Sequence, residues 1–171
     1  MSRARSLAVA CAALGLLVGC ARVPIFAPAP VAPLRLHEIA GEGDAARRAS
    51  QRLVLQGLGY DSQGQARLAR TSYERALQVD VNNPYAYLAL ARQAVESGDG
   101  ATALEYLEQA ELLLGAEARR SPRVEPHLVG LRGGALRASG NPSGGSALLA
   151  RASELAPSVW GDGELSAAEL R

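Results

Sequence analysis

The sequence predicts an all-α fold, and three observations lead to that prediction. Of the 171 residues, 48% are hydrophobic and 20% charged, which are ordinary globular proportions and argue against wholesale disorder. Only 4% are aromatic, whereas alanine and leucine are abundant, and this composition favours helices over strands. From about Asp44 onward, alanines and leucines recur at helical spacing. The length suits one ordinary domain rather than two.

The first 19 residues are predicted to be an export signal. Arg3 and Arg5 give the segment a positively charged start. The uncharged apolar run that follows, Leu7–Val18, has about 12 residues, which is too short to span a membrane and suits the core of a signal peptide. We therefore expect residues 1–19 to be removed from the mature protein.

The end of this segment, Leu17-Val18-Gly19-Cys20, resembles the bacterial lipobox. In lipoproteins of that type the signal peptidase cuts before the cysteine, whose sulfur carries a diacylglycerol and whose new amine is acylated. The resemblance implies that Cys20 is the lipidation site and that the chain is held on a membrane. The next residue, Ala21, implies the outer membrane, facing the periplasm. An ordinary secretory signal with a chance cysteine is the alternative.

Residues 20–43 are expected to be the lipidated cysteine and a Pro-rich tether. Four prolines lie between positions 24 and 33, and such a stretch favours extended polyproline II over a helix or a central strand. At about 3 Å per residue, this tether would hold the domain a few tens of Å from the bilayer. A Pro-rich ligand for another protein is the alternative, but no basic flanking pattern accompanies the prolines.

The predicted helical domain, residues 44–171, contains three units of one 34-residue pattern, over 50–83, 84–117 and 126–159. Small residues recur at unit position 8 and mostly at position 20, and larger ones at positions 4 and 24 and, in two of the three units, at position 11. Small residues let two helices approach closely, while the larger ones fill the space between them. Glycine stands at position 15 of every unit, where it can adopt the left-handed conformation that ends a helix.

This spacing resembles the tetratricopeptide repeat over about residues 44–159. The resemblance implies an α-solenoid of about three helix pairs. The third unit departs from the pattern, with Arg132 at position 7 and Gly145 at position 20, and a spacer over residues 118–125 precedes it. An irregular helical bundle rich in alanine and leucine is the alternative.

Capping signals set the expected helix boundaries. Asn83 and Asn141 each precede a proline, which is the pattern of an N-cap followed by the first helical residue. Asp44 is expected to cap the first helix, and Asp162 a short last helix that covers the open end of the stack. The sequence predicts helices over residues 45–62, 66–80, 84–97, 101–114, 126–138, 143–156 and 163–170.

Groups for catalysis or metal binding are scarce. After removal of the signal, only His37 and His127 remain as histidines, the only cysteine is the lipidated one, and no cluster of metal-ligating residues is evident. We therefore expect no enzyme activity, no metal and no cofactor. Removal of the signal takes away two arginines and no acids, which leaves a net charge of −1 and argues against nucleic acid as a partner.

The resemblance also implies a binding surface, which is the concave face lined by the first helix of each pair. Tyr85 is expected at the centre of this face, with Arg92 and Arg137 to one side, and tyrosine and arginine are enriched among interface hot spots. Carried over position by position, the predicted protein-binding groove consists of Gln51, Val54, Leu58, Tyr85, Leu88, Arg92, Val95, His127 and Arg137. The same unit positions also include Asp61, Glu96, Gly130 and Gly134.

The expected function is that of a membrane-anchored protein-binding adaptor or scaffold of the bacterial cell envelope. An extended peptide or a partner helix would lie in the groove, and no small-molecule substrate is expected. Small tetratricopeptide lipoproteins include pilotin-like factors, so the resemblance implies an assembly factor for a pilus or secretion system. The alternative is a structural envelope lipoprotein that associates with itself, or a scaffold for cell-wall enzymes.

Overall fold

The computed structural model describes residues 30–116 and 121–171, and within these ranges the chain forms helices and no strand. The prediction of an all-α fold is confirmed. The predicted signal over residues 1–19 and Cys20 lie outside the described residues. The six long helices are α1 (Ala45–Asp61), α2 (Ala66–Val79), α3 (Pro84–Glu96), α4 (Gly100–Ala116), α5 (Glu125–Ala138) and α6 (Pro142–Leu155).

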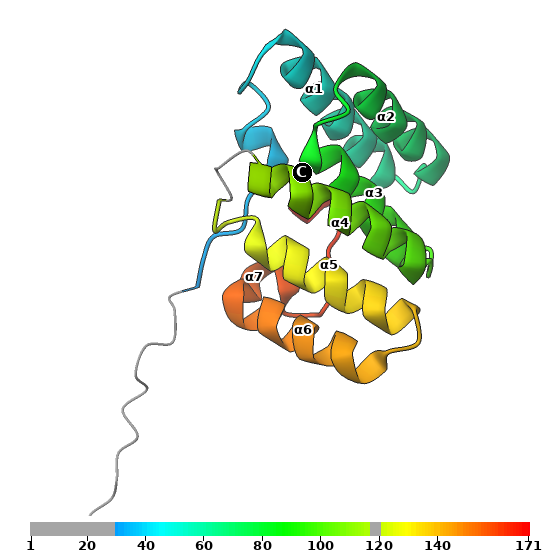
Figure 1. Cartoon of the computed structure of the whole chain (residues 1–171), viewed down its shortest axis with the longest axis vertical. Helices are drawn as coiled ribbons and strands as arrows, with labels where there is room; N and C mark the ends of the chain where they lie inside the picture. Colours follow the sequence, from blue (N-terminus) through cyan, green and yellow to red (C-terminus); the bar gives the residue numbers. More distant parts are fainter. Residues whose placement is uncertain (1–29, 117–120) are drawn as a thin grey trace, which may run out of the picture.

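These helices form three successive pairs, α1 with α2, α3 with α4, and α5 with α6 (Figure 1). The first helix of the middle pair, α3, also contacts α1 on one side and α5 on the other. Each pair turns at a glycine with a left-handed backbone: Gly64 (φ 72°), Gly98 (φ 80°) and Gly140 (φ 85°). The prediction of this conformation at unit position 15 is confirmed in all three units.

The predicted N-caps of α1, α3 and α6 are also confirmed. The side chains of Asp44, Asn83 and Asn141 accept hydrogen bonds of 2.8 to 3.1 Å from backbone N–H groups two or three residues further on. A proline occupies the first helical position after each asparagine, where its missing N–H costs nothing. Local sequence signals therefore fix where α1, α3 and α6 begin.

The third pair is a regular helix pair despite its unusual residues. Arg132 points outward and forms a 2.8 Å ion pair with Glu111 of α4. Gly145 allows α6 to approach α5 closely, because an added Cβ there would lie 2.6 Å from the carbonyl oxygen of Gly133. The departures from the repeat pattern at these two positions therefore do not prevent α5 and α6 from packing together.

The prediction of a single last helix over residues 163–170, capped by Asp162, is wrong. Two short helices occur instead, α7 (Pro157–Trp160) and α8 (Ala167–Leu170). The Asp162 side chain accepts from the backbone N–H of Glu164 in a turn, and Gly163 adopts φ 81° there. Ser166 caps α8 in a reciprocal capping box with Glu169, whose side chain accepts from the Ser166 N–H.

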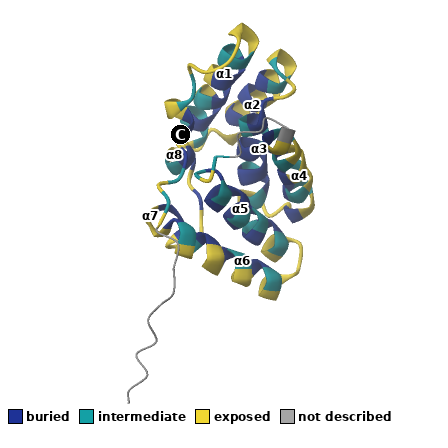
Figure 2. Ribbon diagram, turned by 60° about the vertical axis from the view of Figure 1, so that its left-hand side comes forward, coloured by how far each residue is buried: buried dark blue, intermediate teal, exposed yellow. Residues whose placement is uncertain are grey.

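The tail segment, which we define as residues 161–171, does not cover the end of the stack. Helix α7 contacts α6, whereas α8 contacts α1 at the other end of the molecule (Figure 2). The tail segment therefore crosses the domain from the third helix pair to the first. Trp160, Leu165 and Leu170 are all buried along this path.

A second extended segment, the strap (residues 31–39), also lies against the helices. The Val31 N–H donates to the Leu155 carbonyl at 3.0 Å, and the Leu34 N–H to the Arg123 carbonyl at 2.9 Å. Leu34 and Leu36 are each only 4% exposed. The strap ends in a single 3-10 turn, η1 (Leu36–Glu38). The expected tether over residues 20–43 is thus corrected for its second half, because apolar side chains and paired backbone groups hold residues 31–39 on the domain.

Candidate binding cleft

The structure buries most of the predicted groove. Tyr85 and Val95 are partly buried, and Arg137 is exposed. The expectation of an open groove along the whole concave face is therefore wrong, because the chain covers much of it with its own segments. The buried members are Gln51, Val54, Leu58, Leu88, Arg92 and His127, with exposed fractions between 0% and 6%.

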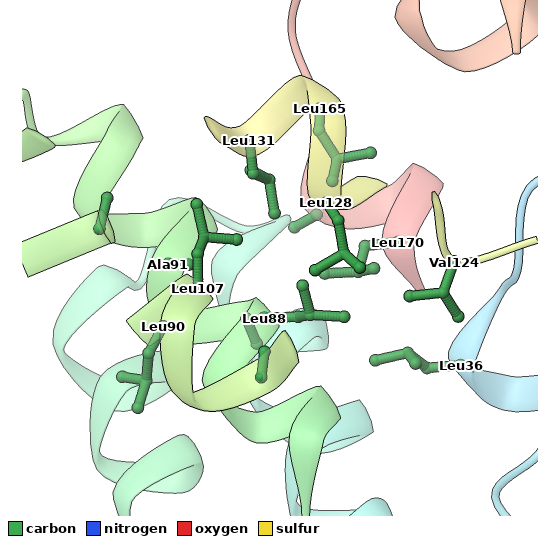
Figure 3. Packing of buried hydrophobic residues seen from close by; sticks show 14 of the residues in the cluster. Leu36, Leu88, Leu90, Ala91, Leu107, Val124, Leu128, Leu131, Leu165 and Leu170 are labelled. Carbon is green, nitrogen blue, oxygen red and sulfur yellow. The ribbon is translucent and has the colours of Figure 1, made fainter. Parts of the chain in front are cut away.

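The strap covers one side of the predicted groove. With its nitrogen turned toward the end of the strap and the turn that follows it, the Gln51 carboxamide shares its two N–H groups among the carbonyls of Ile39, Ala40 and Glu42 at 3.1 to 3.2 Å. Leu36 lies beside Val124, which precedes α5 (Figure 3). These contacts turn Gln51 from a candidate partner contact into an internal one.

His127 holds the strap from the other side. Its Nε2 lies 2.9 Å from the carbonyl oxygen of Leu34, so this nitrogen carries the proton and donates. Burial lowers the pKa of His127 below the usual value of 6.5, opposed in part by the Leu34 carbonyl and Glu169. The imidazole is therefore a neutral structural group that joins α5 to the strap.

The tail segment covers the middle of the predicted groove. Leu165 and Leu170 reach the cluster that contains Leu88 and Leu128 (Figure 3). The tail and the strap also meet, because the backbone N–H and Nδ1 of His37 lie 2.8 and 2.7 Å from the carbonyl oxygen of Arg171. Together the two segments enclose the apolar centre of the face lined by α1, α3 and α5.

One part of this face remains open as a cleft of about 650 Å³. It lies between the C-terminal parts of α3 and α5 and the tail segment. Every lining residue from α3 and most of those from α5 occupy unit positions expected to face a groove. These residues are Arg92, Val95, Glu96, Gly130, Gly134 and Arg137.

The opposite wall of the cleft was missed by the sequence analysis. It comprises Trp160 of α7 with Asp162, Glu164, Leu165 and Glu169 of the tail segment. The sequence does show that Trp160 and the tail leucines are apolar residues near the chain end. That signal predicts that they are buried, but it does not predict against which helices they pack. Only the path of the tail segment across the domain brings this wall opposite α3 and α5.

Arg92 is held inside an ion-pair network at the base of the cleft. Its Nη2 pairs with Asp61 Oδ2 and, at 3.1 Å, with Glu96 Oε2. The Tyr73 hydroxyl donates to the same Asp61 oxygen at 3.0 Å, and burial together with the Asp61 charge raises the pKa of Tyr73 well above its usual value. The Arg92 and Asp61 side chains are only 6% and 3% exposed, so the arginine is neutralised within the chain.

A second hollow of about 490 Å³ lies along the strap. Tyr85 of the predicted groove lines it, together with Arg47, Gln51 and Arg123. Arg123 donates to the carbonyls of Ala32 and Pro33 and pairs with Glu38 at 2.6 Å. This hollow is therefore a seam between the strap and the helices rather than a continuation of the cleft.

Within residues 30–116 and 121–171, no group of three or more histidine, cysteine, aspartate and glutamate residues could hold a metal ion. In the same ranges, no helix combines the length and apolar character needed to cross a membrane.

Comparison of the chain with protein families, with curated proteins and with solved structures found no match.

Proposed function

We propose that this protein is a lipid-anchored adaptor of the bacterial envelope, built on a tetratricopeptide-type solenoid, that binds a segment of a partner protein. The fold part of the proposal is supported by contacts that recur from unit to unit. Gly57 contacts Tyr73 in the first pair, and Gly133 contacts Leu149 in the third, in each case between unit positions 8 and 24. The left-handed glycines at position 15 add a second recurring feature.

The observation that carries the binding function is the cleft of about 650 Å³. Its volume falls in the range of about 300–1,000 Å³ that is usual for ligand sites. It opens on the face that binds partners in proteins of the tetratricopeptide type, and the rest of that face is occupied by the strap and the tail segment. The cleft is therefore the part of the concave face that a partner can reach without displacing either segment.

The envelope location is supported by the signal-like start and the Leu-Val-Gly-Cys sequence that ends at Cys20. Cys20→Ser should abolish lipidation and leave the precursor uncleaved. Metabolic labelling with a fatty acid tests this, with the wild-type chain as the positive control. Label that persists in the variant would contradict the anchor.

Partner binding is tested by blocking the cleft. Ala138 lines it from an exposed position at the end of α5, so Ala138→Phe should reduce crosslinked capture of partners from the native envelope. Ala101→Phe is the matched control, since Ala101 is an exposed alanine of α4 that does not line the cleft. Equal capture by both variants, at equal abundance and lipidation, would move the binding surface away from the cleft.

Self-association is the second candidate function, and one observation favours it. Leu68 and Val79 lie on the same side of α2 and are 51% and 44% exposed, and Val81, two residues after the end of α2, is 61% exposed. A dimer formed through this surface should appear in light scattering as concentration increases. Leu68→Ser should then shift the equilibrium to the monomer, whereas a monomer at all concentrations would exclude this candidate.

A further inference from the structure

We infer that the cleft binds a partner segment through a basic side chain, an arginine or a lysine. This inference rests on the proposed function, because it takes the cleft as the binding site and specifies the chemistry of its ligand. It rests on the charges that line the cleft, on the apolar surface between them and on two buried donor groups in its walls.

The first step concerns the charge of the walls. Four acidic residues line the cleft, Glu96, Asp162, Glu164 and Glu169, against two arginines. Arg92 adds little positive potential, because Asp61 and Glu96 already pair with it. Arg137 is therefore the one lining cation that is not neutralised by an ion pair among the described residues, and the cleft carries a net negative charge.

Two helix ends strengthen the negative potential. Glu96 is the last residue of α3, and Ala138 is the last residue of α5, and both line the cleft. The C-terminal end of a helix carries a partial negative charge from its unpaired carbonyl groups. A cationic group entering here is therefore attracted by carboxylates and by helix ends at once.

Two of the carboxylates are available to a ligand. The Glu96 side chain is 64% exposed and, among residues 30–116 and 121–171, makes only the 3.1 Å contact with Arg92. Glu164 is exposed, and within the described part of the chain its carboxylate makes no hydrogen bond or ion pair. Glu169 is engaged with Ser166 and Asp162 with a backbone N–H, so Glu96 and Glu164 are the acceptors expected for a guanidinium or ammonium group.

The surface between these charges suits a long aliphatic stem. Leu131 and Leu165 line the cleft from α5 and the tail segment, and the Trp160 ring packs on Gly130 while the Val95 side chain packs on Gly134, so these groups make the walls apolar between the charges. Arginine and lysine bury their methylene groups on such a surface while the charged end reaches polar groups.

Two donor groups in the walls lack acceptors. Arg92 and Trp160 line the cleft and are 5% and 2% exposed, yet Arg92 Nε and Trp160 Nε1 have no hydrogen-bond partner among the described residues. Buried donors without partners are costly, so a small shift of the walls that brings the acceptors of a ligand to these two nitrogens is favoured. The backbone carbonyls of a peptide are such acceptors, which favours a peptide segment over an isolated organic cation.

The test uses Trp160, the only tryptophan of the chain, as a fluorescent reporter in the cleft wall. Full-length lipoprotein in a nonionic detergent is titrated with a Gly/Ala peptide containing three arginines. The same peptide with citrulline or with glutamate in place of arginine serves as comparison. We expect a saturable change in the Trp160 emission with the arginine peptide. The affinities of the citrulline and glutamate peptides should be lower by about tenfold or more.

Variants link the effect to the named carboxylates. Glu96→Gln combined with Glu164→Gln should weaken binding of the arginine peptide by about tenfold, because two rim charges are lost. Glu154→Gln is the matched control, since Glu154 is an exposed glutamate on α6 outside the cleft. It should leave the affinity unchanged.

The inference is overturned if no peptide binds, if citrulline or glutamate peptides bind as tightly as the arginine peptide, or if the double variant binds like Glu154→Gln. Failure here is separable from failure of the proposed function. If Ala138→Phe still reduces partner capture while the arginine peptide does not bind, the cleft remains the binding site and its ligand has a different chemistry.

Discussion

Gly57 of α1 contacts the ring of Tyr73 of α2 so closely that a Cβ at residue 57 would lie 2.3 Å from Cε1 of the ring. Tyr73 is fully buried, and its hydroxyl is bound to Asp61, so the ring has little freedom to move. The absence of a side chain at Gly57 therefore sets the distance between the two helices of the first pair.

Gly57→Ala should lower the free energy of unfolding by about 1–3 kcal/mol, because the added methyl group overpacks the contact with Tyr73. Gly59→Ala on the same helix is the control. The nearest atom to a Cβ there is Arg171 Nη1 at 3.9 Å, so alanine should stabilise the helix by about 0.5–1 kcal/mol. Urea unfolding of both variants measures the difference, and equal shifts would show that the contact does not limit the helix distance.

Asp61→Asn should destabilise the fold by about 3–5 kcal/mol, because it leaves the buried Arg92 without its main charge partner. The exposed pair Arg70–Glu74, with side chains 54% and 51% exposed, provides the comparison. Glu74→Gln should change stability by no more than about 1 kcal/mol. If the two substitutions proved equally mild in chemical unfolding, Arg92 would not depend on Asp61 in the folded protein.

Leu36→Ala should cost about 2–5 kcal/mol, the usual effect of truncating a buried leucine. Leu112→Ala on α4 is the control, because Leu112 is 65% exposed and its truncation should change stability by less than about 0.5 kcal/mol. Thermal unfolding, followed by circular dichroism, compares them. A Leu36 variant as stable as the control would mean that the strap contributes no packing energy and acts as a free tether.

Acidification below about pH 6.5 should destabilise the protein through His127. Burial lowers the pKa of His127 in the folded state below 6.5, so the unfolded chain binds a proton that the folded chain excludes. The stability contributed by the neutral imidazole is therefore present above pH 6.5 and is lost as the pH falls toward the folded-state pKa.

The control for this pH effect is His127→Gln, which retains a donor for the Leu34 carbonyl but does not titrate. Unfolding free energies at pH 7.5 and 5.5 should show a larger loss for the wild type than for the variant. Parallel losses would assign the pH dependence to other groups.

The six long helices were predictable because each depends on signals within about one turn of its ends. Asn83 before a proline and Gly64 at the turn after α1 are examples. The start of α8 also has a local signal, since Ser166 and Glu169 have the spacing of a capping box, but Asp162 carries an equally good cap signal four residues earlier.

The strap and the cleft were not predictable from local pattern. The hydrogen bond from His127 to Leu34 spans 93 residues, and no periodicity in residues 31–39 indicates it. The α3 and α5 side of the cleft followed from the repeat register. The tail side of the cleft could not be predicted in this way, because a short segment without helical periodicity does not indicate which helices it will pack against.

The strap also changes how the chain is expected to fold. In a stack of repeats whose units contact only their neighbours, folding can start anywhere and either end can fray alone. Here bonds from Leu34 to His127 and from His37 to Arg171 join residues 93 and 134 positions apart. Contacts this distant form slowly, because a long loop must close first. The helix pairs should therefore form early, and the strap should dock last. Once the strap is docked, it ties the pairs to one another, so the three pairs should unfold together rather than one at a time.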